Sequence, residues 1–156
     1  MRHFPNSLSR AESDAQAGRI RSAMASRGWG FWAVECPGTA PFIGFTGLSV
    51  PGFDAPFTPC VEIGWRLARA FWGQGYASEA ARAALAYGFG TLGLTEILAF
   101  TARGNARSIA VMRRIGMTYD QADDFLHPLL PEGHPVRPHV LFRITAGQDA
   151  RQSCNT

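Results

Sequence analysis

The chain has 156 residues, of which 46% are hydrophobic and 17% are charged. This length and composition are those of one globular domain with a core of ordinary size, and they exclude a disordered chain. The 15 basic residues, all arginine, exceed the 12 acidic ones by a formal net charge of +3, which is too small to indicate a nucleic-acid partner by itself.

The sequence shows no metal site, disulfide framework or membrane segment. Cys36, Cys60 and Cys154 lie far apart in no metal-ligand spacing, and the four histidines form no H-x-H or H-x-x-x-H pair. No apolar run approaches the roughly 18 residues of a membrane span, and the N-terminal region lacks the apolar stretch of a signal peptide. We therefore expect a cytoplasmic protein with no metal and no membrane partner.

The first elements predicted are a helix and a β-hairpin. Ser9-Arg10-Ala11-Glu12 is a capping box, which predicts a helix that runs to about Arg27 and ends at Gly28. Two strand-like runs follow, Gly30–Cys36 and Phe42–Val50. The residues between them have turn chemistry, so the pair predicts a hairpin.

The rest of the chain alternates strands and helices. In Val61–Ala68 polar and apolar residues alternate, as in a half-buried strand of a mostly antiparallel sheet. The later predictions are a helix at Ala77–Leu92, a strand at Thr95–Thr101, a helix at Ala106–Ile115 closed by Gly116, and a strand at His139–Thr145. This order favours an α+β fold. We expect one domain over residues 1–145 and a disordered tail over 146–156.

The segment from Arg69 to Ala80 indicates an anion site. Gly73 and Gly75 stand between a strand and a long helix, so successive N–H groups can point into one concavity beside the positive end of the helix dipole. Such a nest binds phosphate or pyrophosphate. The alternative is a glycine-rich turn that caps the helix and binds nothing.

Two other phosphate loops fit less well. A P-loop requires a lysine, and the chain contains none. A dinucleotide fingerprint could use Ser78 as its third small residue and Glu96 as its acid. However, the preceding strand carries Glu62 and Arg66, whereas the strand of such a motif is a buried apolar run.

Three motifs together resemble the GNAT superfamily, with the RimJ/RimL-like branch as the most similar part of it. They are Glu62–Leu67, the run Trp72–Ala80, and Asn105-x-x-Ser108 leading to Arg114-Ile115-Gly116-Met117. The resemblance covers about Phe31 to Ile144 and implies a mixed, mostly antiparallel sheet flanked by helices. We expect the usual first strand and first helix to be lacking, because Met1–Pro5 looks like the end of that helix.

The resemblance implies that acetyl-CoA binds in a V-shaped gap between the strands Val61–Ala68 and Thr95–Thr101. The backbone of Leu67 and Ala68 would pair with the pantetheine, and Asn105 would hydrogen-bond the CoA arm. Its alternative role is a helix N-cap. The backbone amides implied for the pyrophosphate are those of Trp72, Gly73, Gln74, Gly75, Tyr76 and Ala77.

The reaction that the resemblance implies is attack by a neutral primary amine, a protein N-terminus or a small molecule, on the thioester in a ternary complex. Glu62 is the candidate general base, acting through water, and a solvated or salt-bridged strand residue is its alternative. Glu62 and Leu67 are an odd number of positions apart, so their side chains face opposite sides unless a β-bulge intervenes. In many family members a tyrosine acts as the general acid at the position where this chain has Met112. Ser108 is the first candidate to replace it as the acid, and Tyr119 is the second.

Two further expectations follow from the N-terminal start. Either the chain is truncated or another subunit supplies the missing strand, and an unpaired strand edge favours a homodimer.

The alternative function is a non-catalytic acyl-CoA-binding or regulatory module that keeps the nest without the chemistry. Met112 and the missing elements favour that alternative.

Overall fold

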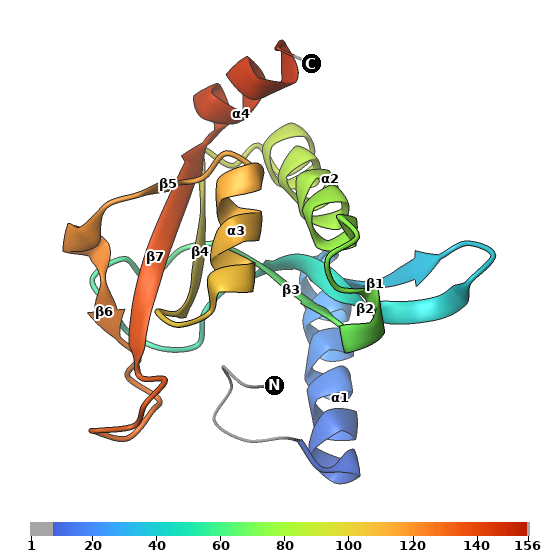
Figure 1. Ribbon diagram of the computed structural model, residues 1–156, viewed down its shortest axis with the longest axis horizontal. Coiled ribbons are helices and arrows are strands. Elements are labelled where there is room, and N and C mark those ends of the chain that lie inside the picture. Colours follow the sequence, from blue (N-terminus) through green and yellow to red (C-terminus); the bar gives the residue numbers. More distant parts are fainter. Residues whose placement is uncertain (1–7, 156) are drawn as a thin grey trace.

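The computed structural model describes residues 8–155. One seven-stranded sheet forms the centre of the molecule, and within the described residues only its β3–β4 pair is parallel. The mixed, mostly antiparallel α+β fold is confirmed. The strand order is β1 (Phe31–Cys36), β2 (Ala40–Ser49), β3 (Glu62–Leu67), β4 (Glu96–Ala102), β7 (Pro138–Thr145) and β5 (Thr118–Tyr119), with β6 (Phe125–Leu126) also on β7 (Figure 1).

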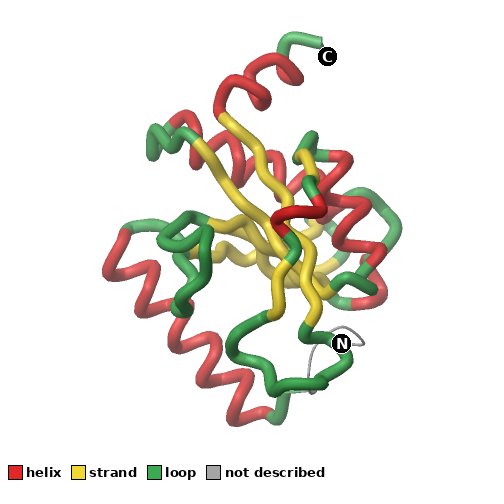
Figure 2. The backbone as a smooth tube through the Cα atoms, turned by 90° about the vertical axis from the view of Figure 1, so that its left-hand side faces the viewer, coloured by secondary structure: helices red, strands yellow, loops and turns green. Residues whose placement is uncertain are grey.

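Helices lie on both sides of the sheet (Figures 1 and 2). They are α1 (Arg10–Arg27), α2 (Tyr76–Gly90), α3 (Ala106–Arg114) and α4 (Ala146–Ser153), with 3₁₀ turns at η1 (Arg69–Phe71) and η2 (Gln121–Asp123). The predicted hairpin and helices are therefore present, with boundaries that differ by one or two residues. The expectation for Met1–Pro5 lies outside the described residues.

The capping box at the start of α1 is confirmed. The Glu12 N–H donates to the Ser9 hydroxyl at 3.2 Å, and the Ser9 N–H donates to the Glu12 carboxylate at 2.7 Å. Gly28 ends the helix with φ 81°, in the left-handed region that glycine adopts without strain. No residue of α1 is buried, so the caps at its two ends, and not an apolar face packed on the core, determine where this helix begins and ends.

The core lies between the sheet and the helices α2 and α3. Small residues let α2 approach the strands closely: Ala81 and Ala84 are buried, and a Cβ on Gly88 would stand 2.7 Å from the Ile97 side chain. The larger buried residues of this core are Leu48, Ile63, Leu85, Ile97, Val111, Met112, Ile115, Met117, Val140, Phe142 and Ile144. This packing fixes the start of α2, and with it the glycine loop, against the end of β3.

The predicted end of α3 is confirmed as a Schellman motif. The Met117 N–H donates to the Met112 carbonyl and the Gly116 N–H donates to the Arg113 carbonyl, both at 3.0 Å. Gly116 has φ 87°, as the left-handed position of this motif requires. Met112 and Met117 are both buried beside it.

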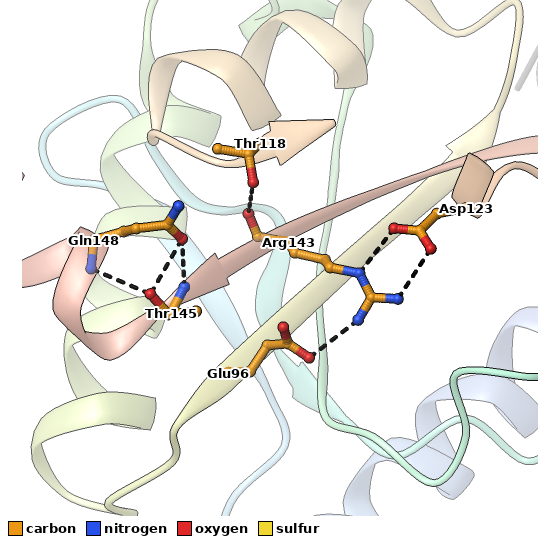
Figure 3. Close-up of polar contacts among 6 residues, drawn as sticks. All are labelled: Glu96, Thr118, Asp123, Arg143, Thr145 and Gln148. Carbon is orange, nitrogen blue, oxygen red and sulfur yellow. Dashed lines mark hydrogen bonds and ion pairs between the residues drawn. The ribbon is translucent and has the colours of Figure 1, made fainter. Parts of the chain in front are cut away.

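The expectation of a disordered tail is wrong for residues 146–153, which form α4. Thr145 and Gln148 make a second capping box, and Gln152 donates to the Gly116 carbonyl at 3.2 Å. Figure 3 shows this cap beside Arg143 of β7, which pairs with Asp123 at 2.9 Å and with Glu96 at 3.1 Å. The T-x-x-Q pattern was a readable signal for this helix.

Candidate active site

The strands β3 and β4 pair only briefly and then separate. Their single register pair is Glu62 with Leu98, and the Leu98 N–H donates to the Val61 carbonyl at 3.0 Å. Beyond this point the described residues of the two strands share no further register pair. This is the V-shaped gap that we expected between them.

The hydrogen-bond alternation of β2 and β3 determines which backbone groups face the gap. The Ala68 N–H donates to the Ile43 carbonyl at 2.8 Å, so this pair is hydrogen-bonded and the next pair, Gly44 with Leu67, is not. The main-chain groups of Leu67, and of Trp65 two residues earlier, therefore point away from β2 and toward β4. No bulge interrupts this register.

Ala68 fits its expected role poorly, because both of its backbone groups are already bonded within the protein. Its N–H donates to Ile43, and its carbonyl accepts from the Phe71 N–H at 2.9 Å. The Leu67 carbonyl accepts from the Trp72 indole N–H at 2.8 Å. The groups that remain directed to the gap are the Leu67 N–H and the main chain of Trp65.

The glycine loop has the geometry of a nest. Gly73 and Gly75 have φ of 74° and 84°, and a Cβ on either would meet nothing within 4 Å. Gly75 is the N-cap of α2 and no side chain caps this helix. The backbone N–H groups of residues 73–77 have no hydrogen-bond partner among the described residues, so they are available for an anion beside the helix dipole.

Trp72 has a different position from the other five residues expected at the nest. Its backbone N–H already donates to the Arg69 carbonyl at 3.2 Å, within η1. Its indole binds the Leu67 carbonyl, and the Arg107 guanidinium lies 5.0 Å from the ring centroid. Trp72 thus ties the glycine loop to the end of β3 and to the start of α3.

Asn105 is the N-cap of α3, which was the alternative reading of this residue. Its side-chain oxygen accepts from the Ser108 N–H at 3.3 Å. Its amide group donates to the Thr101 hydroxyl at 2.9 Å and to the Ser108 hydroxyl at 3.1 Å. Asn105, Ser108 and Met112 also line one cavity, which is called the main cavity.

Glu62 lines that same cavity, which has a volume of about 410 Å³. The Ser49 hydroxyl donates to its carboxylate at 2.8 Å. Burial raises the pKa of Glu62 from its ordinary value of 4.5 to about 7, and the Ser49 hydrogen bond opposes part of this increase. A carboxyl group with such a pKa can accept and release a proton near neutral pH. The opposite facing of the Glu62 and Leu67 side chains is no obstacle, because Leu67 would act through its backbone.

Sequence reasoning missed the aromatic part of the cavity. Its lining includes the side chains of Phe31 from β1, Phe45 from β2 and Phe100 from β4. His127 and His139 line it as well, with ring centroids 4.9 Å apart. Leu130 and Val136, from the loop before β7, line the cavity as well. The sequence carries little sign of this cavity wall, because its aromatic residues stand singly on separate strands and are brought together only by the register of the sheet.

Comparison with known proteins identifies the family of this chain. The model of the "Acetyltransferase (GNAT) domain" matches residues 1–118, so the chain belongs to the GNAT acetyltransferase family. Two curated relatives are the "Uncharacterized protein YkkB" of Bacillus subtilis, 38% identical over 61% of this chain, and the "FsC-acetyl coenzyme A-N(2)-transacetylase" of Aspergillus fumigatus, 40% identical over 64% of it. The aligned parts are 55% and 43% of those proteins, so the chain spans about half the length of the curated relatives it matches.

The solved structures agree on the fold. The acetyltransferase from Agrobacterium tumefaciens is 28% identical with a TM-score of 0.66, over 90% of this chain and 74% of that one.

Within residues 8–155 of this chain, none of the helices is both long and apolar enough to cross a membrane. The same described residues contain no group of three or more potential metal ligands.

Proposed function

We propose that the protein is an N-acetyltransferase that transfers an acetyl group from acetyl-CoA to a primary amine. The observation that carries this proposal is Glu62, a half-buried carboxyl group with a pKa of about 7, in a cavity that adjoins the β3–β4 gap. A protonated amine must lose a proton before it can attack a thioester, and a group titrating near neutral pH suits that task. Membership of the GNAT family supports acetyl transfer as the reaction.

Each part of the site has a proposed role in a ternary complex. Glu62, acting through water, accepts the proton of the amine. The Leu67 N–H donates to the thioester carbonyl as negative charge develops there. Asn105 holds the Ser108 hydroxyl and the start of α3 in place beside the CoA arm. The Ser108 hydroxyl passes a proton to the departing thiolate and takes one from the attacking nitrogen in exchange. The pyrophosphate binds the free amides of Gly73, Gln74, Gly75, Tyr76 and Ala77, with Trp72 holding the loop in place.

Met112 favours a second candidate, a non-catalytic acyl-CoA-binding module. It lines the cavity and is buried at 2% exposure, and its thioether cannot donate a proton. The Ser108 hydroxyl, one turn earlier on α3, is the nearest group that could. The two candidates share the nest and differ only in turnover.

One experiment separates them. Acetyl-CoA affinity is measured by calorimetry, and release of the free CoA thiol is followed over a panel of primary amines. Binding with amine-dependent thiol release supports the acetyltransferase. Binding without release from any amine, for the wild-type chain and Glu62→Gln alike, supports the module. Absence of acetyl-CoA binding contradicts both.

The branch of the family, the location and the oligomeric state of the protein are proposed as well. Trp72 at the start of the loop motif favours the RimJ/RimL-like branch of the family. The sequence features favour a cytoplasmic location with no nucleic-acid partner. We also propose a homodimer, because β1 is an edge strand with β2 as its one neighbour among the described strands.

A further inference from the structure

We propose that the acceptor is an arylalkyl monoamine, in which one primary amino group is joined by a short alkyl chain to an aromatic ring. This inference rests on the proposed function. It follows from three features of the main cavity: the position of two phenylalanines relative to Glu62, the support behind one of them, and the charge of the lining.

The sheet register places two phenylalanine rings at the same level on opposite sides of the gap. Phe31 pairs with Gly47, and Gly47 pairs with Gly64, which is two residues beyond Glu62 on β3. Phe100 is two residues beyond Leu98, the partner of Glu62 on β4. The Cα atoms of Phe31 and Phe100 are therefore each about 7 Å along the strands from the level of Glu62.

Both rings lie on the face of the sheet that carries Glu62. A Cβ built on Gly64 would approach the Phe31 ring at 3.1 Å, so this glycine leaves the space that the ring occupies. Residues two apart on a strand share a face, which places Phe100 on the face of Leu98. Phe31 and Phe100 both line the cavity with Glu62. An amine whose amino group lies at Glu62 would thus place its own aromatic ring between Phe31 and Phe100, provided that two or three carbons join that ring to the amino group.

Phe100 is supported from outside the cavity by other rings. Phe53 and Phe57, from the proline-rich loop before β3, lie 5.7 and 5.9 Å from it. Phe125 lies 5.7 Å from it and 4.8 Å from Phe57. On the opposite wall, Phe31 packs edge-on against Phe45 at 5.2 Å. These contacts fix the two walls as rigid aromatic surfaces, which suit another ring better than a flexible chain.

The charge of the lining selects for a single amino group. Among the described residues that line the cavity, Glu62 alone is acidic, while Arg66 adds a positive charge. Burial lowers the pKa of both His127 and His139, and their proximity lowers that of His127 further. Both shifts favour the neutral imidazole. A second or third ammonium group would lose its hydration with no carboxylate to replace it. The cavity therefore disfavours polyamines.

The test compares three amines by release of the CoA thiol. They are 2-phenylethylamine, 2-cyclohexylethylamine, which has the same shape without the aromatic ring, and spermidine. We expect kcat/KM to fall in that order, with 2-phenylethylamine at least about tenfold above spermidine. Phe31→Leu and Phe100→Leu should each lower the value for 2-phenylethylamine by about tenfold. Phe42→Leu should not, because Phe42 is 60% exposed on β2 and does not line the cavity.

Two further measurements keep this test separate from that of the proposed function. Acetyl-CoA affinity should be unchanged in the three variants, which shows that they fold. Binding of 2-phenylethylamine in the presence of CoA is measured by calorimetry, independently of turnover. Turnover that prefers spermidine, or equal values for all three amines, would overturn the acceptor class and leave the acetyltransferase intact. Absence of 2-phenylethylamine binding to the CoA-bound protein would also overturn it.

Discussion

Ser49 and Glu62 lie directly opposite each other on β2 and β3, and the Ser49 hydroxyl donates to the Glu62 carboxylate at 2.8 Å. Burial and this hydrogen bond act on the pKa of Glu62 in opposite directions, and burial is the larger effect. The resulting pKa of about 7 makes both protonation states accessible at neutral pH. The sheet register thus holds the candidate base together with the group that adjusts its pKa.

Removal of the base should reduce the rate strongly. Glu62→Gln should lower kcat by about 10²–10⁴-fold at pH 7, the usual contribution of a positioned base, with acetyl-CoA affinity retained. In the wild type, the rate should rise as the pH passes about 7, because only the carboxylate accepts a proton. The loss of kcat in the variant, relative to wild type, should become smaller as the pH approaches the pKa of the amine, because free amine is then plentiful. An identical pH–rate profile in the two proteins would return Glu62 to a structural role.

Ser49 should act as a positioning residue through the pKa of Glu62. Its hydrogen bond lowers that pKa, so Ser49→Ala should raise it and move the acid limb of the pH–rate profile to higher pH. The rate at pH 7 then falls, while the plateau at high pH changes less. Ser49→Thr keeps the hydroxyl and is the matched control. If the acid limb of the alanine variant stays in place, the hydrogen bond does not set the pKa.

The same carboxyl group should make stability depend on pH. The folded pKa of about 7 is above the ordinary value of 4.5, so burial of Glu62 is tolerated below pH 4.5 and becomes costly as the pH rises to 7. The difference corresponds to about 3 kcal/mol. The free energy of unfolding of Glu62→Gln, relative to wild type, should therefore rise by up to about this amount between pH 4.5 and 8. Urea denaturation at several pH values measures it, and a constant difference would contradict the pKa.

The nest can be blocked by a side chain at Gly75. Gly75→Val would place a branched group among the free amides of the loop and should abolish acetyl-CoA binding, measured by calorimetry. Gly38→Val in the β1–β2 turn is the matched control: Gly38 has φ 78° against 84° for Gly75, and neither Cβ would meet an atom within 4 Å. The backbone strain is therefore similar in both, and only the first variant should lose binding. Wild-type affinity in folded Gly75→Val would refute the site.

Local signals in the sequence predicted much of the fold. The capping box at Ser9, the turn in the hairpin and the glycine after α3 each determine a structure within a few residues of chain. The short strands β5 and β6 were not predicted, because two-residue strands form only where β7 offers them an edge. α4 was missed although its capping box was readable, since polar composition alone suggested a tail.

The candidate site was less predictable than the fold. The glycine loop is contiguous in sequence, so its geometry could be anticipated. The commitment of the Ala68 N–H to Ile43 depends on which pairs of β2 and β3 are hydrogen-bonded, and no local pattern reveals that alternation. The cavity walls depend likewise on register across four strands, which brings Phe31 and Phe100 to one level.

The last prediction concerns self-association through β1. The ladder with β2 engages Gly30, whose carbonyl accepts from the Leu48 N–H at 3.1 Å, so by alternation the backbone groups of Phe31 and Ala33 point outward from the sheet. Such an edge can pair with a second copy, and light scattering over a concentration series should show a dimer. Ala33→Pro removes one outward N–H without touching the ladder and should shift the mass to that of a monomer. Ala33→Ser keeps the N–H and should remain dimeric. A constant monomer mass for the wild-type chain at micromolar concentration would contradict the homodimer.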